Sequence, residues 1–391
     1  MKTLLFSTLY PNQIQPNFSI FVENRLQQLL ASGEADTKII APVPWFPFKN
    51  NSFGKYAKYA QVASQENRHG VDVFHPRYLV IPRIGMNLAP ETLFRSALPV
   101  ARKILDSGFD FDLIDAHYFY PDGVAAIKLG NVLNKPVVIT ARGTDLNLIP
   151  EYKKAREKII WAAQNAKALI TVCQALKDVL VNFGIANDKI TVLRNGVDLE
   201  KFKPSESRDL LRKELGITGR TLLSVGHLVE RKGHHLIIKA MASLPDFSLL
   251  IAGDGEEMIA LASLVKELKL GNRVTMLGSI SHADLAKYYA AVDALVLASS
   301  REGWANVLLE SMACGTPVAA TNIWGTPEVV NTPEAGVLIR DREPNSIAAS
   351  VLKLFENYPD REKTRQYAER FDWTETTQGQ LKIFNKVLSR A

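Results

Sequence analysis

Short apolar runs alternate with amphipathic stretches along the chain, and this alternation constrains the fold more than any other feature. Runs such as Leu113–Ala116 and Val137–Thr140 are typical of buried strands, whereas Gly123–Leu133 between them has the apolar spacing of a helix. Strands and helices that alternate in this way predict an α/β fold with doubly wound, mostly parallel sheets.

The alternation breaks once, at Arg194 to Asp198, and restarts at Thr221 to Gly226. A turn without regular periodicity fits a linker, and 391 residues are too many for one ordinary core. We therefore expect two Rossmann-like domains that face a central cleft, at residues 1–200 and 201–370. The last stretch, 371–391, has the apolar periodicity of one more helix.

The expected elements follow from the same periodicities. In the first domain we expect helices at 18–30, 93–105, 123–133, 151–165 and 175–183, strands at 3–8, 38–41, 113–116, 137–140, 168–172 and 190–193, and strand-like patches between 61 and 76. In the second domain we expect helices at 234–243, 256–268, 283–291, 307–314 and 346–357, with strands at 221–226, 248–252, 274–277, 294–298 and 317–320.

The composition is ordinary for a globular protein, with 47% hydrophobic and 23% charged residues. No apolar run reaches the roughly 18 residues of a membrane-spanning helix, and the apolar start of the chain lacks a cleavage site and is better interpreted as a first strand. Cys173 and Cys314 stand apart in apolar surroundings, which is typical of buried thiols in a reducing cytosol. We therefore expect a cytoplasmic protein.

The formal net charge is +6, and the first half carries most of it, because residues 1–200 hold 23 Lys and Arg against 18 Asp and Glu. A basic first domain indicates an anionic partner, such as an acidic saccharide or a membrane surface. The charge is too weak and too scattered to predict nucleic-acid binding. Peripheral contact with the inner face of the cytoplasmic membrane is an open alternative.

Two glutamates eight positions apart, Glu302 and Glu310, flank the expected start of the helix at 307–314. Glu302 should lie on the loop after a buried strand and Glu310 about one turn into the helix, where both carboxylates can face one crevice. Open α/β sheets bind ligands outside the carboxyl ends of their strands. Carboxylates accept hydrogen bonds from hydroxyls, and the free N–H groups of a helix start suit a phosphate. The loop from Gly303 to Asn306 also contains a helix-capping candidate.

A second motif follows the first strand of the second domain, where Gly226 precedes Arg231 and Lys232 at the start of a helix. Two cations beside a helix N-terminus can compensate a diphosphate without a metal ion. The chain has no G-x-x-x-x-G-K-[ST], no G-x-G-x-x-G after either opening strand and no Cys/His cluster, so we expect no P-loop, nicotinamide cofactor or catalytic metal. A D-x-D pair, Asp110 and Asp112, precedes a strand and so lies at the wrong end for a site.

In the first domain, His117 follows the strand at 113–116, and Arg142 and Asp145 follow the next strand. Adjacent parallel strands would bring His117 and Asp145 to the same lip of the cleft. A histidine there can orient a sugar or an incoming hydroxyl, although a strand-end histidine that is hydrogen-bonded to a loop is an equally good interpretation.

Taken in order, these motifs resemble those of the retaining glycosyltransferases of the family-4 group, which have the GT-B architecture. The resemblance is carried by Glu302 to Val318, Arg231 to Gly233, Asn195 to Asp198, Ala252 to Gly255, Val274 to Gly278, Ala116 to Tyr118 and Thr140 to Asp145. It runs through nearly the whole second half, and it implies that 371–391 crosses back onto the first domain.

The resemblance implies transfer of a sugar from a UDP- or GDP-linked donor to a hydroxyl of a saccharide or lipid-linked acceptor, with retention at the anomeric carbon and no cofactor. Such enzymes serve in polysaccharide or glycoconjugate synthesis. Arg231 and Lys232 would hold the diphosphate, Glu302 would contact the sugar and Glu310 the ribose. His117 would lie near the transferred sugar. The donor site would also include Gly226, Gly303, Asn306 and Val307.

The acceptor side departs from the family pattern. Many relatives carry a Gly-Gly pair in the loop after the first strand, where this chain has Tyr10 to Asn17. The residues expected to face the acceptor are Asn12, Asn17, His117, Arg142 and Asp145. Aromatic and basic stretches at 43–49, 54–59 and 76–83 either contact a lipid-linked or polymeric acceptor at a membrane face, or fold back over the core. Basic and aromatic residues at 152–161, on one expected helix, add a pattern compatible with interfacial binding.

Two other functions are compatible with the same architecture. One is a sugar-nucleotide epimerase or hydrolase, and the other is a non-catalytic sugar-nucleotide binding protein. The sequence leaves open the nucleotide base, the sugar, the acceptor and its linkage, and the oligomeric state.

Overall fold

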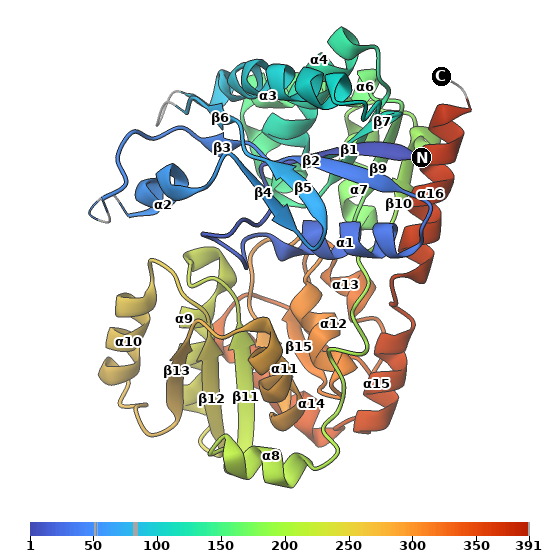
Figure 1. Ribbon diagram of the computed structural model, residues 1–391. Helices are drawn as coiled ribbons and strands as arrows, with labels where there is room; N and C mark the ends of the chain where they lie inside the picture. Colours follow the sequence, from blue (N-terminus) through green and yellow to red (C-terminus); the bar gives the residue numbers. More distant parts are fainter. Residues whose placement is uncertain (51, 53, 81–84, 390–391) are drawn as a thin grey trace. The chain divides into compact units, whose positions relative to one another are not determined.

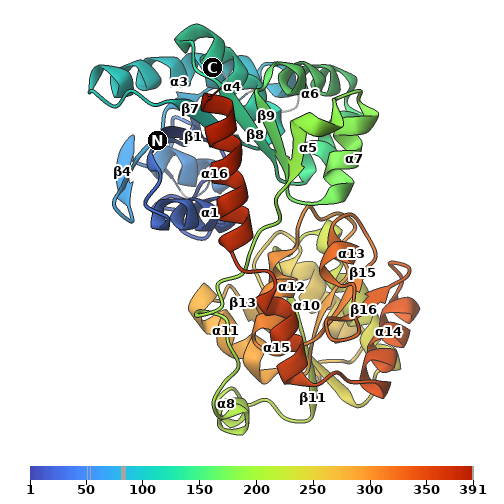
Figure 2. The ribbon, with the colours of Figure 1, turned by 90° about the vertical axis from the view of Figure 1, so that its right-hand side faces the viewer.

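The computed structural model describes residues 1–50, 52, 54–80 and 85–389, which fall into two compact units (Figure 1, Figure 2). Unit 1 comprises Met1–Arg194 and Thr374–Ala391, and unit 2 comprises Asn195–Trp373. The first change of unit therefore comes slightly before the boundary expected at 200. The reason is local, because the N–H of Val197 donates to the carbonyl of Phe371 at 2.8 Å within unit 2.

A mixed sheet forms the centre of unit 1, and its strands follow the order β10-β9-β8-β7-β1-β2-β5-β4 in the described part of the chain. Its strands are β1 Lys2–Phe6, β2 Asp36–Ile40, β4 Gln65–Arg68, β5 Val71–Phe74, β7 Leu113–His117, β8 Val137–Ala141, β9 Ala168–Thr171 and β10 Ile190–Val192. Strands β7 and β8 are buried along their whole length, which is typical of a parallel sheet covered on both faces. A small parallel pair accompanies it, β3 Val43–Pro44 and β6 Arg77–Tyr78.

The helices of unit 1 include the last helix of the chain. They are α1 Ile20–Ala31, α2 Lys55–Gln61, α3 Ala89–Asp106, α4 Val124–Leu133, α5 Thr144–Asn147, α6 Lys153–Asn165, α7 Gln174–Asn182 and α16 Thr374–Leu388. Both views show α16 alongside α1 (Figure 1, Figure 2). Leu381, Phe384 and Val387 of α16 are buried in the core that Val22 and Leu26 of α1 also join. The apolar stripe seen in the sequence therefore packs against unit 1.

Unit 2 is built on a parallel sheet with the strand order β13-β12-β11-β14-β15-β16. Its strands are β11 Arg220–Val225, β12 Phe247–Ala252, β13 Val274–Gly278, β14 Ala294–Leu297, β15 Val318–Thr321 and β16 Gly336–Ile339. Its helices are α8 Arg208–Glu214, α9 His234–Ala240, α10 Met258–Glu267, α11 His282–Ala291, α12 Asn306–Ala313, α13 Thr326–Val329, α14 Pro344–Glu356 and α15 Arg361–Glu369. This order is that of the dinucleotide-binding folds, in which the direction of winding reverses between β11 and β14.

Several elements differ from the sequence-based expectation. Residues 55–61 form helix α2 rather than loop or strand, and β4 pairs with β5 in antiparallel fashion. Helix α15 was not predicted because it has almost no apolar stripe; the side chain of Asp360 stabilises it by accepting the N–H groups of Glu362 and Lys363. Strand β16 was missed because only Ile339 of its four residues is buried.

Both cysteines are buried, as predicted. Among the described residues, no helix combines the length and the apolar content that crossing a bilayer requires.

The packing of α16 generates a test of the unit boundaries. Phe384 is fully buried in unit 1, so Phe384→Ala should weaken unit 1 by about 3–5 kcal/mol. Hydrogen exchange measured by mass spectrometry should then show faster exchange in α1, β1 and β2, with unit 2 unchanged. Lys382→Ala on the exposed side of the same helix is the control and should have no such effect. Equal loss of protection in both units would contradict the assignment.

Candidate functional site

The loops after β11 and β14 meet at the reversal point of the sheet in unit 2, and they bring Lys232 and Glu302 together. The Nζ of Lys232 lies 2.5 Å from Oε1 of Glu302, which also accepts a hydrogen bond from the Ser299 hydroxyl at 2.7 Å. Only 13% of the lysine side chain and 10% of the glutamate side chain are exposed. The two motifs predicted to form one site are therefore in contact.

Two glycines allow this close approach. Gly233 has φ = +72°, and a Cβ on it would lie 2.2 Å from the carbonyl oxygen of Ala298, so the turn after Lys232 packs directly on the end of β14. Gly226 has φ = +152°, and the stem of Lys232 passes over the position that its Cβ would take. The lysine is thus positioned by backbone that a larger residue could not form.

Arg342 contacts the same loop from a third direction, a role that no motif in the sequence indicates. Its guanidinium donates to the carbonyl of Ala298 at 2.9 Å and to both the carbonyl and Oε1 of Glu230, at 2.6 and 3.0 Å. Its partners lie 44 and 112 positions away in the chain, so no local pattern could indicate the role. Arg342 therefore links Glu230, which directly precedes Arg231, to the end of β14 by hydrogen bonds.

The charges of this cluster favour an ionised carboxylate facing a cation. Burial would raise the pKa of Glu302, but Lys232 and the hydrogen bond from Ser299 outweigh it and lower the pKa below its ordinary value. The neighbouring Arg231 is partly exposed, and its Nη1 donates to the carbonyl of Arg301 at 3.4 Å. Burial, with the charge of Lys232, lowers the pKa of His234 to about 4, so this histidine is neutral at physiological pH.

Glu310 lies about one turn into α12 and has different partners from Glu302. Its Oε2 accepts the hydroxyl of Tyr289 at 3.1 Å, and its Oε1 lies 3.5 Å from Nε2 of His282, both on α11. Burial, together with the charge of Glu310, raises the pKa of Tyr289 well above its ordinary value. Glu310 is thus held as a hydrogen-bond acceptor about one turn into α12.

The expected helix cap does not form. Asn306 is the first residue of α12 rather than its cap, and its side-chain oxygen accepts from the amide of Asn195 at 3.2 Å. Gly303 is buried, and Val307 lies partly exposed in the first turn of the helix. The Asn-Gly-Val-Asp turn that begins unit 2 therefore supports the start of α12.

In unit 1, His117 at the end of β7 is the centre of a buried polar network. Its Nε2 lies 3.0 Å from Oδ2 of Asp115, and its Nδ1 is paired with the Arg142 guanidinium. The amide of Gln380 on α16 donates to the same Oδ2 at 2.9 Å, and its oxygen accepts Nε of Arg25 at 2.9 Å. Helix α16 therefore anchors the network, a role that the sequence did not suggest.

Burial determines the charge of these groups. It lowers the pKa of His117 to about 4, an effect that the Asp115 carboxylate opposes and the charge of Arg142 strengthens. Burial also lowers the pKa of Arg25 to about 10, although the charge of Asp115 opposes this shift. His117 is thus a neutral imidazole at physiological pH and only 1% exposed.

Two residues expected to face the acceptor are buried instead, and their side chains accept hydrogen bonds from the backbone of unit 1. Asp145 is fully buried, and its oxygens accept the N–H groups of Phe119, Arg142 and Gly143. Asn12 is buried too, and its Oδ1 accepts the N–H groups of the two residues at 14 and 15 in a tight turn. Both side chains shape loops because their short polar groups replace backbone partners. Asn17, in contrast, is exposed.

A buried carboxyl that the sequence did not single out links the loops that follow β1 and β7. The carboxyl of Asp122, which follows β7, accepts the N–H and the hydroxyl of Thr8, which follows β1. Burial raises the pKa of Asp122 to about 7, although the hydrogen bonds from Thr8 oppose this shift. A cavity of about 140 Å³ adjoins Thr8 and is lined largely by aromatic and proline side chains.

Comparison with known proteins gives the family. Residues 207–371 match the family described as Glycosyl transferases group 1, and residues 60–201 match the family described as Glycosyltransferase Family 4. The chain belongs to the family-4 glycosyltransferases. It follows that the chain is an enzyme with a sugar donor and an acceptor as substrates, so the epimerase, hydrolase and non-catalytic alternatives are not supported.

Individual relatives and solved structures match this glycosyltransferase over almost its whole length. A candidate teichuronic acid biosynthesis glycosyltransferase, TuaC of Bacillus subtilis, is 28% identical over 359 residues, which are 90% of this chain and 89% of that protein. Sucrose-phosphate synthase from Thermosynechococcus elongatus has a TM-score of 0.79 at 18% identity, covering 100% and 99% of the two chains. Anabaena HepE in complex with UDP has a TM-score of 0.74 at 22% identity, covering 99% and 100%. These structures confirm the predicted GT-B fold.

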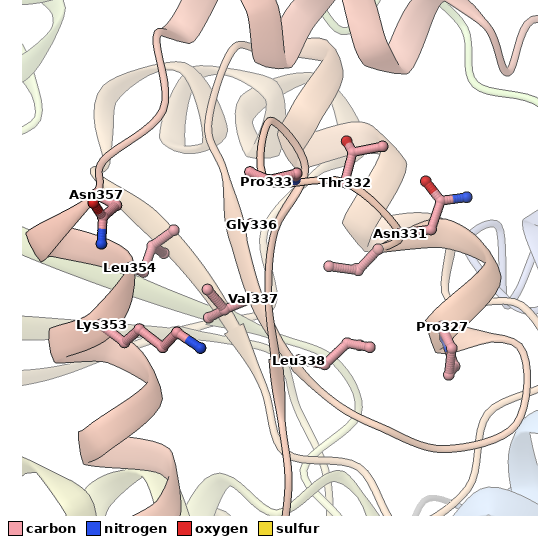
Figure 3. Close-up of a pocket in the computed structure, with 11 residues that line it drawn as sticks. Pro327, Asn331, Thr332, Pro333, Gly336, Val337, Leu338, Lys353, Leu354 and Asn357 are labelled. Carbon is pink, nitrogen blue, oxygen red and sulfur yellow. The ribbon is translucent and has the colours of Figure 1, made fainter.

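Unit 2 of this glycosyltransferase also has a cavity of about 740 Å³ beside β16 (Figure 3). Its lining comes from the loop at Asn331 to Pro333, from β16, from Lys353 and Leu354 of α14, and from Asn357 directly after that helix. None of the predicted site residues lines it, and it offers one lysine and no carboxylate. Among the residues described, no group of three or more His, Cys, Asp or Glu side chains is arranged to hold a metal ion.

The buried histidine of unit 1 predicts a pH dependence. An unfolded histidine binds a proton below about pH 6.5, whereas folded His117 does so only near 4, so stability falls between these values as the pH is lowered. The loss is about 1.4 kcal/mol per pH unit. His117→Gln removes this contribution, so the difference in unfolding free energy between wild type and variant should shrink from pH 6.5 to 4.5.

The measurement is urea unfolding at several pH values. Hydrogen exchange is the readout, and it reports the unfolding free energy of unit 1. Gln380→Leu is the control, because it breaks the same network without removing a titrating group, and its cost should stay nearly constant over this range. If wild type and His117→Gln lose stability with the same slope, His117 is not held neutral in the folded protein.

Proposed function

We propose that this glycosyltransferase transfers a sugar from a nucleoside diphosphate, with retention at the anomeric carbon and without a metal ion. The observation that carries the proposal is the largely buried pair of Lys232 and Glu302 at the reversal point of unit 2. A cation and an anion held side by side there suit a ligand that carries both phosphates and hydroxyls.

Lys232 and Arg231 are the proposed diphosphate contacts. Both are cations on one turn, and the partly exposed Arg231 side chain leaves room for a ligand beside it. A phosphate oxygen would compete with Glu302 for the ammonium of Lys232, and each charge-assisted hydrogen bond would contribute about 1.5–3 kcal/mol. The same two cations would stabilise the charge that develops on the diphosphate as it leaves.

Glu302 and Glu310 are proposed to accept hydrogen bonds from different hydroxyls. When a phosphate engages Lys232, the ionised Glu302 carboxylate becomes available to the hydroxyls of the transferred sugar. Glu310, which contacts Tyr289 and His282 from α12, would accept a hydrogen bond from the ribose. Main-chain groups near Asn306 and Val307 would complete the donor site.

The proposed reaction uses no nucleophile from the protein. The bond between the anomeric carbon and the diphosphate oxygen breaks, and the acceptor oxygen forms its bond to that carbon on the same face. The leaving diphosphate takes the proton of the acceptor hydroxyl. The protein contributes positioning and charge stabilisation, which suffice because the leaving group is already a good one when it is paired with cations.

The acceptor is proposed to be an acidic saccharide or a lipid-linked saccharide bound by unit 1. The basic first half of the chain supports this, and so does the similarity to a protein named for teichuronic acid biosynthesis. His117 is buried, so we assign it a positioning role through Arg142 rather than a direct role in catalysis. Asn17 is the exposed member of the predicted acceptor residues.

Contact with an anionic membrane is proposed through the start of α6. Tyr152, Lys153, Lys154 and Arg156 are exposed there, which supports an interfacial role. Two other residues of the predicted patch are turned inward, because Lys158 donates to the carbonyl of Asn87 and Trp161 is half-buried. Trp45 and Phe48 add exposed aromatic area. Of the stretch at 76–83, residues 81–83 lie outside the described residues.

Two substitutions separate the proposed roles of the central pair. Lys232→Met should weaken binding of the nucleoside diphosphate about 10- to 100-fold, because a charge-assisted contact is lost, and it should abolish most transfer. Glu302→Gln should lower kcat/KM at least about 100-fold and leave nucleoside diphosphate binding intact or tighter, because Lys232 is released. Calorimetry and a transfer assay measure the two effects.

The matched control is Lys239→Met, an exposed lysine on α9 of the same unit, which should behave as wild type. Transfer that survives both Lys232→Met and Glu302→Gln would show that the site lies elsewhere.

The stereochemistry of the product tests the mechanism separately. A retaining enzyme should give a product whose anomeric configuration equals that of the donor sugar. Nuclear magnetic resonance of the early product reads the configuration before any mutarotation. An inverted product would require a general base from the protein and would refute the mechanism proposed here.

A further inference from the structure

Unit 1 carries a cavity of about 430 Å³ at the edge of its sheet opposite to the acceptor-side loops. Lys167 directly precedes β9 and Lys189 directly precedes β10, so the cavity lies at the amino ends of these strands. His117 and Ala141 end β7 and β8, and β7 to β10 are mutually parallel. The cavity is therefore remote, within unit 1, from the loops that follow those strand ends.

Three lysines dominate the polar lining. Lys167 and Lys189 come from the sheet edge, and Lys386 comes from the last turn of α16, which Figure 1 shows beside β10. Asp188 is the one carboxylate in the lining, and Thr191 adds a hydroxyl. The remaining lining residues are apolar: Ala168, Ala186, Ile383 and Val387.

The protein compensates these positive charges only in part, because Asp188 is the one carboxylate in the lining. Among the described residues, none of the three lysines forms an ion pair with a carboxylate, and Lys189 donates instead to the carbonyl of Gln164 at 2.7 Å. Burial, together with the nearby charge of Lys167, lowers the pKa of Lys189. Like charges gathered in a partly enclosed cavity repel one another, and a bound anion would relieve that repulsion.

We propose that this cavity binds a phosphate monoester, with the phosphate among the three lysines and the organic part against the apolar wall. The lysines and Asp188 together leave two positive charges, which match the charge of about −1.5 to −2 on a phosphate monoester at neutral pH. Lysine ammonium groups bind phosphate as point charges. The apolar wall and the volume favour an ester over inorganic phosphate.

Calorimetric titration with phenyl phosphate at physiological salt tests the proposal. The full chain is used in a Lys232→Met background, so that the donor site does not contribute. Binding should be saturable, at least about tenfold weaker in Lys386→Glu, and unchanged in Lys382→Glu, which reverses an exposed charge one turn away on α16. Absence of saturable binding, or equal affinity in Lys386→Glu and Lys382→Glu, would overturn the proposal.

Folding and ligand source are controlled separately. Thermal unfolding without ligand shows whether Lys386→Glu is folded, and Lys189→Met is the second variant, with the same expected loss of binding.

Vesicles of phosphatidylcholine with or without phosphatidic acid then identify the source of the monoester. Vesicle binding that requires phosphatidic acid and Lys386 indicates a lipid headgroup, and binding of phenyl phosphate alone indicates a soluble ester. Binding that is insensitive to both lysine substitutions contradicts the site.

Discussion

The ion pair between Lys232 and Glu302 is the interaction on which the candidate donor site depends. Both side chains are largely buried, so each charge needs the other as its partner, and loss of one partner of such a pair costs about 3–5 kcal/mol. The close packing of Gly233 on the end of β14 and the clamp from Arg342 bring the two loops together. In the function proposed above, a phosphate replaces the glutamate as the partner of the lysine, which would couple donor binding to the availability of the Glu302 carboxylate.

Unit 1 depends on a different interaction, a network of polar side chains that is almost entirely buried. Asp115, His117, Arg142, Gln380 and Arg25 contact one another around the end of β7, and burial keeps His117 neutral. Such a network is costly if any member is lost, because the remaining groups stay buried without partners. The last helix of the chain is thus both a packing element and a polar anchor of the loops in unit 1.

The fold was predictable because strands and helices alternate with clear periodicities in both halves, and the parallel, buried strands of both sheets follow from that pattern. The contact between the Arg231-Lys232 turn and the Glu302 loop was also predictable, since both follow strands that end at the same edge. The roles of Arg342 and Gln380 were not, because their partners lie 112 and up to 355 positions away. Nor could the residues show that Asp145 and Asn12 point inward, since a short polar side chain in a loop can serve either the backbone or a ligand.

The most direct measurement is a crystal structure of the protein with UDP or GDP bound. The account predicts that the diphosphate lies within hydrogen-bond distance of Nζ of Lys232 and of the Arg231 guanidinium, with the ribose next to Glu310 and the Lys232–Glu302 distance increased. A nucleotide bound in the cavity beside β16, or anywhere that leaves the Lys232–Glu302 pair intact and both cations without a phosphate, would contradict it.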